Sequence, residues 1–355
     1  MLRRSFVAAL ATAALTSRAR ALPSLGSGQP GRDRLIMDAM GELRLEYPHE
    51  LIREMLASGM DAITITLSDP KLEGAAALEL AVDELLAYDR FIAARPELLV
   101  KATSVADLDR ARREGKLAVF YLFQNTVQFG SDLDRVDLFR SMGLRTCQLT
   151  YNTRNLSGVG CFESGGLTPF GREMIERMNA RGMLLDLSHA NMETMAGAAA
   201  ASRAPVVVSH TTCAAVHEHQ RATTDANIRA VAERGGVVGI CQLRPFLTTK
   251  KADNLHAYFD HLLHAVNVGG AEHVCIGSDR DHRRIELTPE YVAELTREAG
   301  GRSLEDELPW FIHELNGPRR MEVVWDGLVK RGLPARDVER VMGANLRRLY
   351  REVIG

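Results

Sequence analysis

The chain has 355 residues, of which 46% are hydrophobic and 25% charged, and its formal net charge is −2. This composition supports a large buried core and excludes a disordered chain or a basic nucleic-acid-binding protein, so we expect no nucleic-acid partner. The five cysteines have no C-x-x-C spacing, which argues against a disulfide framework and favours small buried residues.

The first element along the chain is predicted to be an export signal over residues 1–21. Arg3-Arg4 precedes a short apolar run over 7–15, and Ala19-Arg20-Ala21 has the form of a cleavage site. The arginine pair favours a twin-arginine signal, with an ordinary Sec signal or an uncleaved anchor as alternatives. Residues 22–34 are interpreted as a flexible leader. We therefore expect a periplasmic or otherwise exported protein without a transmembrane span after signal removal, because no other stretch approaches the ~20 apolar residues that a span requires.

From residue 35 onward, short apolar runs alternate with amphipathic segments. The runs are continuous rather than alternating, which is typical of strands that are buried on both faces. Helices are predicted over 169–181, 191–201 and 225–234, and two more over 321–331 and 335–351. The pattern predicts one (β/α)8 TIM barrel over 35–355 with C-terminal helices, and a doubly wound open sheet is the alternative. The predicted strands cover residues 35–40, 62–67, 117–123, 146–151, 183–188, 205–209, 236–241 and 273–277.

Polar side chains follow several of these runs, and such positions form the active site in barrels of this kind. Two histidines, His189 and His210, end neighbouring strands, and Asp279 ends the last strand. Imidazoles at adjacent strand ends can share one ion, so we expect a metal site there rather than two histidines that only form hydrogen bonds. Imidazole suits zinc and also iron. The other polar residues at strand ends are Gln124, Tyr151, Asn152, Ser188, Gln242 and Ser278.

Several segments resemble the membrane (renal-type) dipeptidases of the amidohydrolase superfamily. The resemblance covers roughly residues 35–352. It is carried by residues 166–171, 179–189, 202–210, 277–279 and 341–347. It implies a barrel that holds two zinc ions, cleaves dipeptides and often forms a homodimer. It also implies that His189 and His210 hold the second ion, that Asp279 carries protons, and that Arg221 binds the carboxylate of the substrate.

The chain departs from the family pattern at the other positions of the site. Met40 and Glu42 stand where the family has the histidine and the aspartate of the first ion, and Gln124 stands at the bridging glutamate. Tyr151 stands at the histidine that polarises the scissile carbonyl. Two divalent ions ~3.5 Å apart repel by about 20 kcal/mol at an effective dielectric constant of 20, and an amide cannot offset this as a carboxylate does. We therefore expect one divalent ion, most readily zinc, or none.

The sequence leaves the remaining ligands and roles open. Asp279, Gln124 or Glu42 could complete the coordination shell, although Glu42 could equally form an ion pair with Arg44 or with an arginine at the barrel mouth. Tyr151 and Asn152 are candidate substrate-binding residues, and the Tyr151 hydroxyl could stabilise a developing oxyanion. Arg221 could instead be an exposed arginine beside a helix that starts near Thr223.

The predicted function is a metallohydrolase that acts on a dipeptide or a small amide carrying a carboxylate, by attack of metal-activated water. An exported single-metal oxidative or tailoring enzyme is one alternative, and a catalytically inactive binding protein is another. The charged segment 280–284 could select an anionic substrate, but we expect it to be a solvated surface loop.

Overall fold

The structure is a computed structural model that describes residues 34–298 and 303–355. The predicted signal and all but the last residue of the predicted leader lie outside these residues. Ten strands are described: β1 (Met37–Gly41), β2 (Ala62–Leu67), β3 (Leu99–Lys101), β4 (Leu117–Phe123), β5 (Leu144–Gln148), β6 (Leu184–Asp186), β7 (Val207–Cys213), β8 (Ala222–Thr223), β9 (Val237–Ile240) and β10 (Val274–Ile276).

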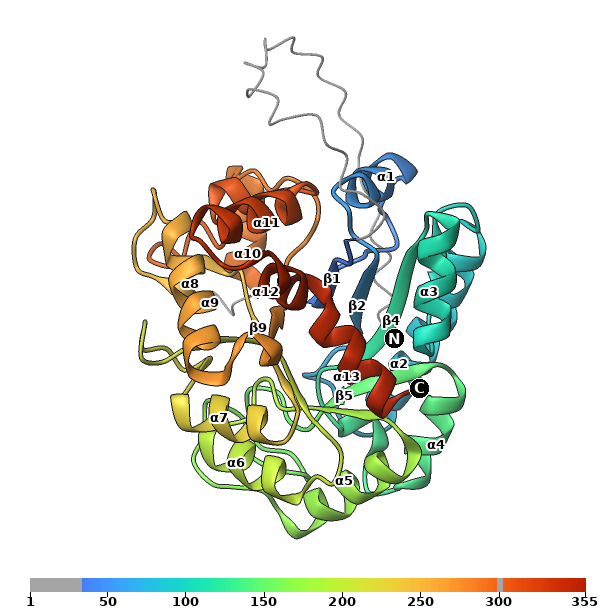
Figure 1. The fold of residues 1–355 in the computed structure, drawn as a ribbon. Coiled ribbons are helices and arrows are strands. Elements are labelled where there is room, and N and C mark those ends of the chain that lie inside the picture. Colours follow the sequence, from blue (N-terminus) through green and yellow to red (C-terminus); the bar gives the residue numbers. More distant parts are fainter. Residues whose placement is uncertain (1–33, 299–302) are drawn as a thin grey trace. The chain divides into compact units, whose positions relative to one another are not determined.

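Eight of these strands close into a parallel barrel. The order around it is β1, β2, β4, β5, β6, β7, β9 and β10, and β10 pairs with β1 to complete the ring. Figure 1 shows the strands in the interior with helices around them. The predicted (β/α)8 barrel is confirmed, and its eight strands are the eight apolar runs of the sequence.

Helices lie between successive strands and after the last one. They are α1 (His49–Ala57), α2 (Gly74–Ala93), α3 (Val105–Glu114), α4 (Asp134–Ser141), α5 (Pro169–Arg181), α6 (Met192–Ala201), α7 (Asp225–Glu233), α8 (Arg244–Leu247), α9 (Leu255–Gly269), α10 (Pro289–Glu298), α11 (Arg320–Lys330), α12 (Ala335–Glu339) and α13 (Asn345–Val353). A π-helical turn over Arg340–Ala344 joins α12 to α13. The predicted helix over 335–351 is therefore one helical run with a widened turn inside it.

Three of the predicted helices, α5, α6 and α7, lie between barrel strands, and each begins directly after a residue whose side chain caps it. Thr168 accepts a hydrogen bond from the Gly171 backbone at the start of α5, and Asn191 does so from Thr194 at the start of α6. Thr224 caps α7 in the same manner. Each cap satisfies a backbone N–H group that the first helical turn leaves without a partner.

The sequence patterns missed two short strands. β3 pairs with the first half of β4, along the edge whose second half pairs with β5. β8 pairs with β7 outside the barrel order. Strands of three and two residues are too short to show a periodic pattern.

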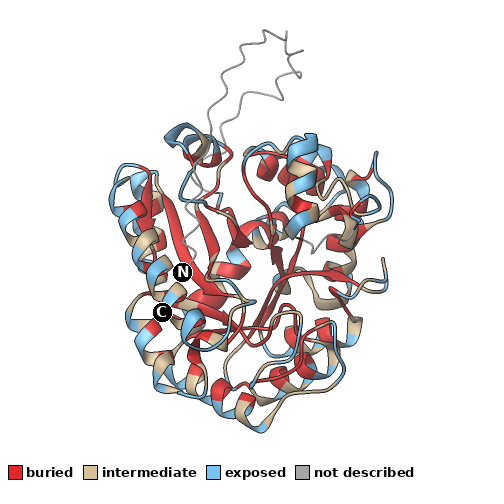
Figure 2. Cartoon of the chain, turned by 180° about the vertical axis from the view of Figure 1, so that it is seen from behind, coloured by how far each residue is buried: buried red, intermediate tan, exposed pale blue. Residues whose placement is uncertain are grey.

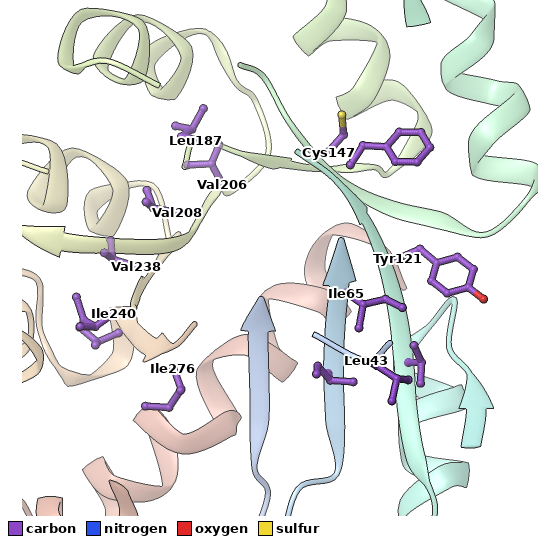
Figure 3. Packing of buried hydrophobic residues seen from close by; sticks show 14 of the residues in the cluster. Leu43, Ile65, Tyr121, Cys147, Leu187, Val206, Val208, Val238, Ile240 and Ile276 are labelled. Carbon is purple, nitrogen blue, oxygen red and sulfur yellow. The ribbon is translucent and has the colours of Figure 1, made fainter. Parts of the chain in front are cut away.

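Alternate residues of most barrel strands enter two different cores. On β4, Leu117, Val119, Tyr121 and Phe123 pack between the barrel and the helices, whereas Ala118 and Phe120 belong to the cluster inside the barrel. Figure 2 shows that the strands are mostly buried, and Figure 3 shows outer-core side chains of β2, β4, β7, β9 and β10. The strands are apolar on both faces because both faces are covered.

The last helix, α13, covers the interior cluster. Its residues Leu346, Leu349 and Tyr350 pack with the inward-facing side chains of the strands. The Tyr350 hydroxyl lies 2.5 Å from the Thr64 hydroxyl of β2, and its ring meets Phe120 edge to face. Since the other end of the barrel carries polar residues, the site lies at the carboxyl ends of the strands, which we call the mouth.

Two further predictions concern the cysteines and membrane-spanning helices. The five cysteines are all free, and only Cys161 is not fully buried. Among the described helices, none combines the length and apolar character needed to cross a bilayer.

Candidate metal centre

Two histidines from neighbouring strands meet at the mouth. His189 follows β6 and His210 lies on β7, and their Nε2 atoms are 3.0 Å apart. Two nitrogens that each lie about 2.0–2.1 Å from one ion at tetrahedral or slightly narrower angles are about 3.0–3.4 Å apart. The separation of the two imidazoles therefore fits a shared ion.

The outer nitrogen of each ring has a fixed partner. Nδ1 of His189 lies 2.6 Å from Oδ1 of Asn152, which can only accept, so this nitrogen donates. Nδ1 of His210 lies 2.8 Å from the Ser209 hydroxyl, which donates its own proton to Asp186 at 2.5 Å. His210 must then donate to Ser209 as well. With these tautomers both rings present an Nε2 lone pair to the other, an arrangement that a cation bound by both nitrogens would stabilise.

Both imidazoles are neutral. Burial, together with the nearby Arg221 guanidinium, holds the pKa of His189 and of His210 well below the ordinary value. Neutral imidazole is the form that binds a metal. Within residues 34–298 and 303–355, no group of three or more His, Cys, Asp or Glu side chains has metal-binding geometry. The two histidines fit an ion, and its remaining ligands would be neutral side chains, water or substrate.

Two glycines allow the strands to approach Ser209 closely. A Cβ atom at Gly277 would lie 1.7 Å from the Ser209 carbonyl oxygen, and one at Gly239 would lie 2.1 Å from it. Any larger residue at either position would displace the strand that carries His210. The Gly277-Ser278-Asp279 segment therefore needs its glycine for packing against the histidine strand.

Two candidate site residues have a left-handed backbone. His189 has φ 64° and Asp279 has φ 54°, a region that residues other than glycine occupy at a cost of about 1–3 kcal/mol. Ser68, after β2, is a third with φ 69°. All three follow barrel strands at the mouth, where strained backbone is typical of functional positions.

The charge of Arg221 acts on the two histidines and on Asp279. Burial raises the pKa of Asp279 to about 6, and Arg221 partly opposes that rise. The side chain of Arg221 is buried, and its Nη2 donates to the His210 carbonyl at 3.1 Å. The alternative of an exposed arginine is thus wrong, because Arg221 lies inside the mouth next to the histidine strand.

Tyr151 and Asn152 flank His189. The Tyr151 ring stacks on the His189 imidazole with centroids 4.2 Å apart, and burial raises the pKa of its hydroxyl to about 12, so the phenol is neutral. Asn152 contacts His189 directly and also accepts a hydrogen bond from Cys161 at 3.5 Å. Asn152 therefore orients the His189 imidazole. The sequence predicted only a contact of Asn152 with substrate. Gln124 is half-buried directly after β4.

The end of β1 contributes no histidine to the site. Glu42 forms an ion pair with Arg44, which is one of the two roles considered for it. The register of β1 against β2 shifts between Asp38 and Gly41, so regular alternation does not fix the side of Met40 and Glu42. Asp38 accepts hydrogen bonds from Ser278, both from its backbone at 2.8 Å and from its hydroxyl at 2.5 Å.

The segment 280–284 is not the solvated loop that we expected. Arg280, Asp281 and His282 are buried, and only Arg283 and Arg284 are exposed. Arg320 of α11 fixes the segment by donating hydrogen bonds to the carbonyl oxygens of Arg280 and Asp281. The expectation failed because a charged pattern does not show that an arginine of a later helix binds this backbone.

Sequence reasoning also missed the support behind His210. Asp186 accepts hydrogen bonds from the Ser188 backbone and from both groups of Ser209, and it is completely buried. A signal was present, because Asp186 and Asp38 are the charged residues inside two otherwise apolar strand runs. Carboxylates in such positions are retained only with several donors around them.

A parallel (β/α)8 barrel with two neutral histidines at the ends of adjacent strands is the architecture of the metallo-dependent hydrolases. Residues 47–297 match the sequence model of the membrane dipeptidase family, peptidase family M19. The chain belongs to this family. The match begins after β1.

The chain is similar to several known proteins. It is 28% identical over 253 residues to the dipeptidase tcpJ of Claviceps purpurea, which is 70% of this chain and 53% of that protein. It is 33% identical over 178 residues to an uncharacterized dipeptidase of Schizosaccharomyces pombe, with 48% and 43% covered. The chain thus spans about half the length of these curated relatives. The crystal structure of an amidohydrolase from Pseudomonas aeruginosa has a TM-score of 0.80 and 29% identity, covering 91% of this chain and 98% of that one.

Proposed function

We propose that this protein is a metal-dependent hydrolase of dipeptides or small amides that carry a carboxylate, and that it works with one ion held by His189 and His210. The observation that carries the proposal is the pair of Nε2 atoms 3.0 Å apart, each with its outer nitrogen already donating. Family membership supports the reaction class.

Each residue of the site has a separate role in this reaction. When bound, the ion would polarise the scissile carbonyl and lower the pKa of a water molecule toward ~7. Asp279 accepts the proton of the attacking water and passes it to the leaving amine, a step for which a raised carboxyl pKa is suited. Arg221 binds the substrate carboxylate through its planar guanidinium. The neutral Tyr151 hydroxyl donates a hydrogen bond to the developing oxyanion.

The charges at the mouth support one ion rather than two. The guanidinium of Arg280 interacts electrostatically with both Asp279 and Glu42, and Arg44 pairs with Glu42. These cations already offset the carboxylates that a second ion would need. The Gln124 amide would be a neutral ligand and adds no negative charge.

Hydrolysis of a dipeptide panel with added zinc tests the proposal. We expect turnover that is lost in His189→Ala and Asp279→Asn but kept in His256→Ala, which removes an exposed histidine of α9. Turnover that persists in His189→Ala, or that requires iron and oxygen, would overturn it. Zinc-loaded protein that binds dipeptides without hydrolysing them would instead support a binding protein.

We also propose that the protein acts outside the cytoplasm, because the arginine pair and the Ala19-Arg20-Ala21 site have the form of an export signal. Fractionation of cells that express the full chain tests this. Cleaved protein in the exported fraction is expected, with loss of export in an Arg3→Lys, Arg4→Lys variant. Uncleaved protein retained in the cytoplasm would contradict it.

A further inference from the structure

Among the described residues, Arg280 is a buried arginine that forms no ion pair with a carboxylate. It directly follows Asp279, and its carbonyl accepts a hydrogen bond from the Glu42 backbone at 3.2 Å, which places it beside β1 at the mouth. Its exposed fraction is 6%. Nη1 has one long contact, 3.5 Å to the Trp310 carbonyl, and Nη2 is buried with no hydrogen-bond partner among the described residues. The guanidinium lies over the Phe311 ring at 5.8 Å.

Two other buried arginines differ from it. The three side-chain nitrogens of Arg244 donate to the carbonyl oxygens of Pro309, Thr248 and Asp306. Both Nη atoms of Arg320 donate to oxygens around the 280–282 segment, and its charge faces Asp38. Arg244 and Arg320 therefore hold segments of the backbone in place. Nη2 of Arg280 has no acceptor among the described residues, and Arg280 directly follows Asp279 at the mouth.

A buried guanidinium with free donors is costly unless something completes its contacts. Taking a charged group out of water without partners costs several kcal/mol, and a carboxylate restores this loss through a bidentate, charge-assisted pair. The nearby carboxylates, Glu42, Asp279 and Asp281, interact with Arg280 electrostatically, but none of these three forms an ion pair with it. Asp281 is paired with Arg44 and Arg283. Asp279 is needed for proton transfer, and Glu42 is paired with Arg44.

We propose that Arg280 binds a second anionic group of the substrate. Arg221 would bind one carboxylate from the side of β7, and Arg280 would bind another from the side of β10 and β1. The preferred substrates are then dipeptides or amides with two carboxylates, such as those with an acidic side chain. This inference rests on the proposed function, because it names the substrate class of that same site.

Matched acid and amide substrates test the role of Arg280. The kcat/KM ratios of Ala-Asp to Ala-Asn and of Asp-Ala to Asn-Ala are measured for the wild type, Arg280→Gln and Arg280→Lys. We expect the wild type to prefer the acid in at least one pair. That preference should fall by about ten- to a hundredfold in Arg280→Gln, the range for a lost charge-assisted hydrogen bond. Arg280→Lys should keep part of it, because the charge stays and the fork is lost.

Arg283→Gln is the control, since this arginine lies in the same segment but is exposed and paired with Asp281. Its acid-to-amide ratio should equal that of the wild type. An Arg280→Gln ratio equal to the wild-type ratio would overturn the inference while leaving the hydrolase proposal intact. If no dipeptide is hydrolysed at all, calorimetric binding of N-acetylaspartate and N-acetylasparagine decides. Tighter binding of the aspartate that Arg280→Gln abolishes supports the inference, and equal binding of both contradicts it.

Discussion

Two parts of the mouth contain the same hydrogen-bonded unit of aspartate and serine but differ in the residues beside it. We call them the β6–β7 rim (Asp186, Ser209, His189, His210) and the β10–β1 rim (Asp38, Ser278, Met40, Glu42). In each, one carboxylate oxygen accepts two backbone N–H groups, from Ser188 and Ser209 or from Met40 and Ser278. The other oxygen accepts the serine hydroxyl at 2.5 Å.

The next contact of each serine distinguishes the roles of the two units. On the β6–β7 rim the serine continues to a histidine ring, so the buried carboxylate orients an imidazole. On the β10–β1 rim the Ser278 hydroxyl accepts a hydrogen bond from Nη2 of Arg320 at 3.4 Å, and the neighbouring positions carry methionine and a glutamate paired with Arg44. The aspartate and serine of each rim therefore join neighbouring strand ends through hydrogen bonds within the protein.

The strongest contrast between the rims is expected in catalysis. His210→Ala should abolish metal binding and lower kcat/KM at least about a thousandfold, because polarisation by the ion contributes several kcal/mol. Met40→Leu, the matched change on the other rim, should lower it less than about threefold. Steady-state kinetics at saturating zinc measures both. A comparable loss in the two variants would remove the distinction between the rims.

The second contrast concerns stability and pH. Burial raises the pKa of Asp38 from 3.8 to about 6 in the folded protein. The folded state then holds this proton more tightly than the unfolded state, so the stabilisation is present below pH 4 and is lost as the pH rises through 6. At 1.36 kcal/mol per pKa unit, the loss amounts to about 3 kcal/mol. The unfolding free energy of the wild type minus that of Asp38→Asn should fall by this amount between pH 3.5 and 7. If denaturant titrations gave a difference that does not change with pH, the pKa of Asp38 would not be raised by folding.

The sequence predicted the barrel and the meeting of His189 with His210 at its mouth, but it did not predict the residues that support them. Continuous apolar runs identify strands covered on both faces, and strands that all run parallel place His189, His210 and Asp279 at one end. The support behind the ligands is not periodic. Contacts such as Ser209 with Asp186, or Arg320 with the 280–282 segment, join residues far apart in the chain, and only the closed fold brings them together.

The third contrast tests the two serines. Ser209→Ala removes the acceptor that fixes the His210 ring, so zinc affinity should fall by about ten- to a hundredfold, the usual effect of losing such a partner. Ser278→Ala breaks the equivalent contact on the β10–β1 rim and should leave zinc affinity unchanged. Competition with a chromogenic chelator measures both affinities. Equal weakening in the two variants would mean that both rims hold the ion.

The most modest change is expected in the number of bound ions. A Met40→His, Glu42→Asp, Gln124→Glu variant introduces, at the ends of β1 and β4, the ligands and the bridging carboxylate that the family resemblance implies. We expect its zinc content to rise from one equivalent to two, because negative charge again offsets the repulsion between the ions. If the content remained at one, the cause of the single site would lie elsewhere, with Arg280 as the first group to change.

Metal analysis of the purified wild-type protein is the decisive measurement for a single ion on the β6–β7 rim. Elemental analysis and zinc titration should give one equivalent per chain, which His189→Ala or His210→Ala abolishes. Two equivalents per chain, or one equivalent that survives in both histidine variants, would show that the site is not the one described.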